Sequence, residues 1–157
     1  IIYDRLNECV RRVYPFSSFE ASNYHESIPE SIRQDLAESA RCFNCDAYKA
    51  TIVLLRRIVQ SLILDTIKDP AIKNKKLWEQ IDELFNLGFI TKNLKDAAHE
   101  VRHFGNFGAH PSDDDLDKTT KEEAILVDGL TRDLLRAIYV SPYETEKLKI
   151  KRSGKTP

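Results

Sequence analysis

Apolar residues recur every three or four positions along most of this chain, which is the spacing of amphipathic α-helices. One predicted helix covers residues 30–42 and follows Ser27-Ile28-Pro29-Glu30, a capping residue with proline and an acid at the first turn. Another covers residues 47–67, with Asp46 as its candidate cap, and is apolar on almost every side. Such a helix belongs at the centre of a bundle or is shared with a second subunit.

The second half of the chain continues this periodicity. A helix is predicted over residues 77–87, and Gly88 follows it in the position where glycine commonly ends helices. The next runs from about residue 91 to His110, and the last covers residues 122–139 and ends at Pro142. No stretch alternates apolar and polar residues as a strand does, so the predicted fold class is all-α, a bundle of five to six helices.

The length of 157 residues favours one main domain. Residues 1–28 are predicted to hold an amino-terminal helix and an irregular segment, residues 29–142 the helical domain, and residues 143–157 a basic tail that we expect to be poorly ordered. The basic stretch 68–76 is expected to be a surface loop.

The amino-acid composition limits the classes of function that this chain can have. The chain has 24 Lys and Arg against 25 Asp and Glu, so no bulk charge attracts it to nucleic acid and any polyanion site must be local. The longest apolar run, residues 50–55, is too short to span a bilayer, and three cysteines are too few for a disulfide framework. We therefore expect a cytoplasmic protein without a membrane partner. Because the sequence contains no methionine, we expect further domains in a longer chain.

The segment from His99 to His110 holds three of the four histidines. On one helix its polar side chains fall within a sector of about 100°, while the glycines lie on an opposite, apolar face that suits close packing against the central helix. The polar set is Arg102, Asn106, His99, His110 and His103. Arginine binds anions and histidine exchanges protons near neutral pH, so this stripe suits a phosphate ester. The alternative is a solvated helix face, although such faces are usually rich in Lys and Glu.

The pattern Arg102-x-x-Gly105-Asn106-x-x-Ala109-His110, with Ile28-Pro29-Glu30, Leu36-x-Glu38-Ser39-Ala40 and the stretch around Leu55-Arg56-Arg57, resembles the bacterial domain-of-unknown-function family 4145. That family belongs to the HEPN superfamily of helical domains, and the resemblance covers residues 28–142. In HEPN ribonucleases an arginine, the polar residue after it and a histidine a few positions later form an active centre that a homodimer usually completes.

The resemblance implies metal-independent RNA cleavage with a cyclic phosphate product, and no cofactor. It makes Arg102, Asn106 and His110 the candidate catalytic residues, and His103, His99, Arg56 and Arg57 candidates for binding or supporting the phosphate. The spacing departs from the usual motif, because Gly105 stands where its arginine is expected. Three interpretations stay open: an endoribonuclease of a bacterial defence or restriction-associated protein, an RNA- or nucleotide-binding sensor, and a non-catalytic dimerisation or docking domain of a larger enzyme.

Metal chemistry is a weaker interpretation. His99-Glu100-x-x-His103 satisfies the short zinc-protease motif, but Glu100 lies off the histidine stripe and a bundle offers no strand to hold a peptide. Cys42-x-x-Cys45 is half of a zinc site without a second pair, so two buried thiols at a helix end are expected instead. No metal site is predicted.

Two further expectations concern packing. Arg56 and Arg57 lie in the most apolar helix, so acids should lie beside them, with Asp35, Glu38, Asp82 and Glu83 as the candidates. Trp78 is expected in the core or an interface. The apolar surplus favours a homodimer in which two Arg102-Asn106-His110 stripes face each other.

Overall fold

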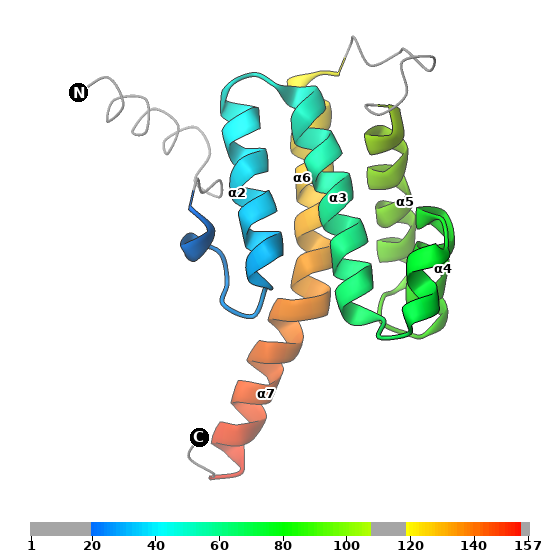
Figure 1. The fold of residues 1–157 in the computed structure, drawn as a ribbon. Helices are drawn as coiled ribbons and strands as arrows, with labels where there is room; N and C mark the ends of the chain where they lie inside the picture. The colour runs from blue at the N-terminus through cyan, green and yellow to red at the C-terminus, as the bar shows by residue number, and fades with distance from the viewer. Residues whose placement is uncertain (1–19, 108–118, 155–157) are drawn as a thin grey trace, which may run out of the picture.

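Every regular element that the structure describes is helical, which confirms the all-α class (Figure 1). The computed structural model describes residues 20–107 and 119–154. Its α-helices are α2 (Glu30–Asn44), α3 (Tyr48–Thr66), α4 (Leu77–Asn86), α5 (Lys92–Phe107), α6 (Lys121–Leu135) and α7 (Ser141–Arg152). Two short 3₁₀ helices, η1 (Ala21–Asn23) and η2 (Pro70–Asn74), and a π-helical segment, η5 (Arg136–Val140), complete the order.

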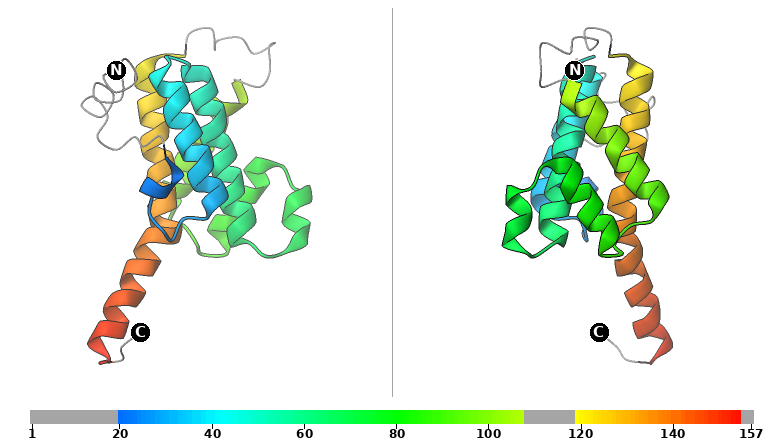
Figure 2. Two further views of the ribbon diagram at one scale, coloured as in Figure 1. Left: turned by 60° about the vertical axis from the view of Figure 1, so that its left-hand side comes forward. Right: turned by 90° about the vertical axis from the view of Figure 1, so that its right-hand side faces the viewer.

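Helix α3 is the centre of the bundle. It packs against α2, α4, α5 and α6, and in Figure 1 it lies between α2 and α5 with α6 behind it; Figure 2 shows the same bundle from two other sides. Its buried side chains include Leu55, Ile58 and Ile63, each 0% exposed. The predicted central helix is therefore confirmed. Part of its apolar surface stays accessible in the single chain, at the half-buried residues Val53, Leu54 and Leu64.

The turn between α2 and α3 differs from the predicted cap. Ala47 occupies the N-cap position of α3, and no side chain caps that end. Asp46 instead has a φ of 58°, a left-handed conformation that aspartate tolerates better than most residues. Its carboxylate accepts a hydrogen bond from the Tyr48 hydroxyl at 2.7 Å. The predicted cap is wrong because Asp46 is used to reverse the chain.

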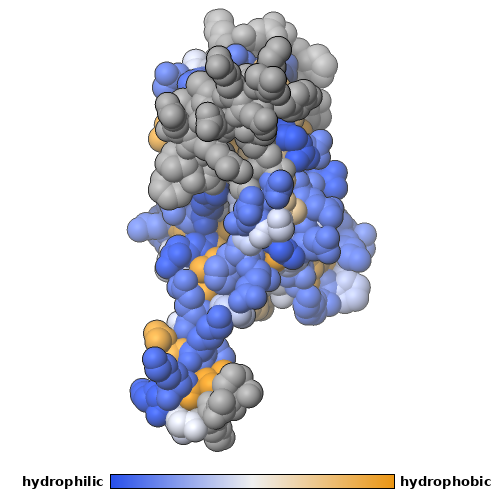
Figure 3. All heavy atoms as spheres, turned by 90° about the vertical axis from the view of Figure 1, so that its left-hand side faces the viewer, coloured by the Kyte–Doolittle hydropathy of each residue, from blue (hydrophilic) through white to orange (hydrophobic). Residues whose placement is uncertain are grey.

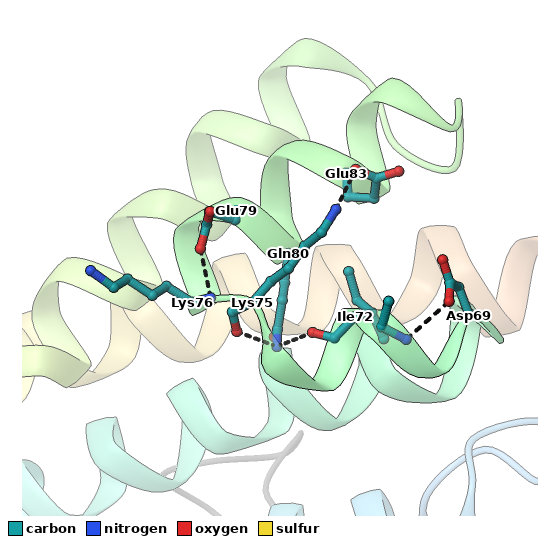
Figure 4. A network of polar contacts seen from close by, with 8 residues as sticks. Asp69, Ile72, Lys75, Lys76, Glu79, Gln80 and Glu83 are labelled. Carbon is teal, nitrogen blue, oxygen red and sulfur yellow. Dashed lines mark hydrogen bonds and ion pairs between the residues drawn. The ribbon is translucent and has the colours of Figure 1, made fainter.

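Residues 68–76 are more ordered than the expected loop, since they contain η2. The side-chain amide of Gln80, which is fully buried, donates hydrogen bonds to the carbonyls of Ile72 and Lys75, both at 3.0 Å (Figure 4). Ile72 is also buried, and the Asp69 carboxylate caps η2 by accepting from the Ala71 amide at 2.9 Å. In the sequence, Ile72 is an apolar residue in a stretch rich in lysine, and this is the signal that the segment turns towards the core.

The predicted helix end at Pro142 is wrong. The π-helical segment η5 leads from α6 into α7 without a break in the helical backbone, and Pro142 lies at the start of α7, next to the wider π-helical turn that accommodates a residue without an N–H. Residues 143–152, expected to be a poorly ordered tail, belong to α7. This helix projects from the bundle (Figure 1), and Figure 3 shows hydrophobic and hydrophilic residues side by side on it.

The first turn of α7 is tied to the segment before α2. The Tyr143 hydroxyl donates to the Glu26 carboxylate, and Lys147 lies 3.7 Å from the same carboxylate. Farther along, Leu148 is 70% exposed. The predicted amino-terminal helix lies outside the described residues, and its boundary with the helical domain stays a prediction.

Trp78, which is predicted in the core or an interface, is 46% exposed on α4, so the core position is wrong and the interface stays a prediction. Helix α4 buries Leu77, Gln80, Ile81 and Leu84, and Trp78 lies outside this set. Within the described ranges, no helix has both the length and the apolar character needed to cross a membrane.

Candidate anion-binding site between α3 and α5

The two helices that carry the candidate residues, α3 and α5, are in close contact at Gly105. This residue is buried, and a Cβ added to it would lie 2.8 Å from Cγ of Arg56 and nearer still to Cβ and Cδ. The aliphatic stem of Arg56 therefore lies directly on the α5 backbone. The prediction that Gly105 is a close-packing point against the central helix is confirmed, whereas Gly108 lies outside the described residues.

Beyond Gly105, Arg56 reaches the next residue of α5. Its Nε donates a hydrogen bond to Oδ1 of Asn106 at 2.9 Å, and the side chain is half-buried. Among the described residues no carboxylate pairs with it, so the expected acidic partner of Arg56 is wrong. Arg56 faces α5, whereas the candidate acids lie on α2 and α4.

Arg57, one residue later, points in a different direction. Its Nε lies 3.1 Å from Oδ2 of Asp35 on α2, which confirms the acidic partner predicted for this arginine. The Arg57 side chain is 69% exposed, so this ion pair is mostly in solvent. Successive helix positions are separated by about 100° around the axis, which explains why the two arginines face different neighbours.

Arg102 brings a second positive charge to the site. It lies one helical turn before Asn106 on α5, and its Nη2 is 3.0 Å from Nε2 of His103. Burial, together with the positive charge of Arg102, lowers the pKa of Arg56. Arginine nevertheless stays protonated in proteins, so both guanidinium groups are cationic at neutral pH. The Nε of Arg102 is buried without a partner in the described part of the chain.

The histidines are placed apart. His99 turns towards α4, where its Nε2 is 3.1 Å from Oδ1 of Asp82, and Lys95 Nζ lies 2.9 Å from the same oxygen. Hydrogen bonds from Lys95 and then His99 lower the pKa of the Asp82 carboxyl. His103 is exposed beside Arg102, and His110 lies outside the described residues. His99 is thus occupied in linking α5 to α4.

No cluster of three or more potential metal ligands occurs in residues 20–107 and 119–154. Cys42 is half-buried and Cys45 is exposed at the carboxyl end of α2, so the helix-end position is confirmed but the prediction of two buried thiols is wrong. Burial raises the pKa of the Cys42 thiol, with a smaller contribution from Glu38.

The structure therefore brings together three of the predicted residues, Arg56, Arg102 and Asn106, with His103 at their margin. Arg57 and His99 have carboxylate partners elsewhere. Arginine guanidinium groups are suited to phosphate oxygens because they combine permanent charge with several directed N–H donors. Two such groups without a carboxylate between them can hold an oxyanion. Sequence reasoning missed the direct contact between Arg56 and Asn106, since the two are 50 positions apart.

Fold and site together define an all-α bundle in which the described residues place two arginines, and no carboxylate paired with them, where the central helix meets α5. The chain belongs to the family described as Domain of unknown function (DUF4145), whose family model matches residues 37–151. This match confirms the family named in the resemblance, and it extends beyond Pro142 to include most of α7. No curated protein and no solved structure matches the chain.

Proposed function

We propose that this domain is a HEPN-like endoribonuclease that acts without a metal ion in a bacterial defence or restriction-associated protein. The observation that carries the proposal is the pairing of Arg56 and Arg102 beside Asn106, with no carboxylate partner in the described residues. RNA is the substrate because its backbone supplies phosphate groups, and its 2′-hydroxyl supplies the nucleophile that metal-free cleavage needs.

The proposed reaction starts at the ribose next to the scissile phosphate. The 2′-oxygen loses its proton and bonds to phosphorus, while the bond from phosphorus to the 5′-oxygen breaks and that oxygen is protonated. The products are a 2′,3′-cyclic phosphate and a 5′-hydroxyl. Arg56 and Arg102 stabilise the negative charge on the non-bridging oxygens. His110, assigned from the sequence, takes the proton from the 2′-oxygen, and one proton is returned to the 5′-oxygen, so the step balances.

Asn106 has a positioning role in this scheme. Its Oδ1 accepts from Arg56 Nε, so the guanidinium is held at the junction of α3 and α5. His103 lies at the solvent side of Arg102, where it can contact a neighbouring nucleotide. A homodimer in which two such sites face each other is part of the proposal.

The test is incubation of purified protein with end-labelled single-stranded RNA in EDTA, followed by analysis of product ends. We expect cleavage with 2′,3′-cyclic phosphate ends, and we expect His110→Ala and Arg102→Ala to reduce it by about a hundredfold or more. Arg136→Ala is the matched control, because it removes an exposed arginine charge at the α6–α7 junction. Failure to cleave a varied RNA pool, with protein that is folded and dimeric, would overturn the proposal.

The rival function is a docking domain of a larger enzyme, and α7 is the observation that favours it. This helix has no buried residue and exposes Leu148 beside several basic side chains. In the same RNA assay a docking domain gives no cleavage under any condition.

A further inference from the structure

We propose that Arg56, delivered by the central helix across Gly105, is the principal phosphate-binding residue of this domain, and that one phosphate group bridges Arg56 and Arg102. The inference concerns the same site as the proposed function and specifies how it holds its ligand. It assigns the main charge to α3, although the sequence motif lies wholly on α5.

The packing at Gly105 is the first step of the argument. Because Cβ, Cγ and Cδ of Arg56 all lie where a side chain at position 105 would be, only glycine leaves room for this arginine. The arginine stem is thereby confined against the α5 backbone before any ligand arrives. Because the Arg56 side chain is already held in place, it loses less conformational entropy when a ligand binds, which is the general advantage of a preorganised site.

The second step concerns the N–H donors of the two arginines that are available to bind a ligand. Asn106 takes the Nε proton of Arg56, and among the described residues the two Nη groups of Arg56 have no hydrogen-bond partner. Arg102 brings a second guanidinium group, whose Nη2 lies 3.0 Å from Nε2 of the exposed His103. These donors belong to two helices, so a ligand with several acceptor oxygens can engage both.

Electrostatics favours an anion at this place. Burial and then the positive charge of Arg102 disfavour the charged form of Arg56, so the pKa of its guanidinium is lowered. An anion between the two guanidinium groups converts their repulsion into two attractions. A tetrahedral phosphate offers oxygens in several directions and so fits donors arriving from two helices.

The test uses inorganic phosphate as the probe and the intact chain. Titration is followed in the proton–nitrogen correlation spectrum through the amide of Gly105, with sodium chloride at matched ionic strength as the reference. We expect saturable shifts at Gly105 and Asn106. Arg56→Met is the principal variant, because methionine keeps an unbranched stem for packing against Gly105 and removes the charge.

Arg56→Met is expected to weaken phosphate binding by about tenfold or more, the effect of losing a charged hydrogen-bonding group. Arg56→Lys is expected to restore only part of it, because lysine has no Nε to donate to Asn106. The control Arg136→Ala removes the same charge at a distant position and should leave binding within about twofold of the parent. The spectra themselves show whether each variant is folded.

Equal binding by Arg56→Met and the parent protein would overturn the inference, as would an equal loss in Arg136→Ala, which would indicate bulk charge alone. Failure of the proposed function has a different signature. Phosphate binding that depends on Arg56, without any RNA cleavage, supports this site and rejects the ribonuclease. RNA cleavage that is unaffected by Arg56→Met supports the ribonuclease and rejects this assignment.

Discussion

Adding a methyl group at Gly105 and at Gly129 provides a direct measure of the contact between α3 and α5. Both glycines lie within helices, but a Cβ at Gly105 would overlap the stem of Arg56, whereas a Cβ at Gly129 on α6 would meet no atom within 4 Å. Alanine is a better helix former than glycine by about 1 kcal/mol, and both variants gain this contribution. The difference in free energy of unfolding between the two variants therefore measures the effect of packing at Gly105.

Overpacking a close contact typically destabilises a protein by about 1–3 kcal/mol. Cβ of Arg56 cannot move without moving the α3 backbone, so Gly105→Ala should show this effect. We expect Gly129→Ala to be more stable than the parent by about 1 kcal/mol. Gly105→Ala should be less stable than Gly129→Ala by about 1–3 kcal/mol, which corresponds to about 2–12 °C in Tm for a chain of this size.

Urea unfolding followed by far-ultraviolet circular dichroism measures both free energies, and equal slopes of the two transitions show that the unfolded states are comparable. Gly105→Ala should also shift the Nε resonance of Arg56, since the hydrogen bond to Asn106 is displaced. If the two variants are equally stable and the Arg56 resonance is unchanged, the close contact at Gly105 is refuted, together with the preorganisation argued from it.

Four other predictions follow from local contacts. Gln80→Ala should destabilise the fold by about 1–3 kcal/mol and speed amide exchange at Lys75, because the two carbonyls that Gln80 binds lose their donor. Thr120→Ala removes the α6 capping box and should lower the free energy of unfolding by about 1 kcal/mol, whereas Thr145→Ala on exposed α7 should have little effect. Hydrogen bonds lower the pKa of Asp82, so its contribution to stability is present above the ordinary pKa and is lost as pH falls; Asp82→Asn should therefore flatten acid unfolding, measured by urea midpoints. Burial and Asp65 raise the pKa of Tyr139, so its contribution is lost as pH rises through the folded value; ultraviolet titration should show a late-ionising tyrosine that Tyr139→Phe removes.

Helix positions were largely predictable because each helix carries its own signals. The apolar period, the proline near the start of α2 and Gly88 after α4 are local features, and Gly88 indeed has a φ of 80°, which favours glycine. Local signals failed at Pro142 and Asp46. Proline can end a helix or lie in a continuous helical path beside a π-helical turn, and aspartate serves both as a cap and as a left-handed turn residue, so only the path of the chain decides between these uses.

The candidate site was predictable only in part. The α5 stripe is a periodic feature of one helix, so Arg102 and Asn106 could be placed on a common face from their spacing. The role of Arg56 depends on which face of α3 meets α5. Sequence alone suggested acidic partners for both arginines, and the structure gives Asp35 to Arg57 and Asn106 to Arg56.

By itself the sequence determined the helical class, the central apolar helix and the polar stripe, because these depend on interactions between residues a few positions apart. Only the tertiary structure decided which helices pack against α3, that His99 binds Asp82, and that Arg56 lies across Gly105. These outcomes depend on the mutual rotation of packed helices. That rotation minimises overlap and unpaired polar groups over the whole bundle, so no single segment encodes it.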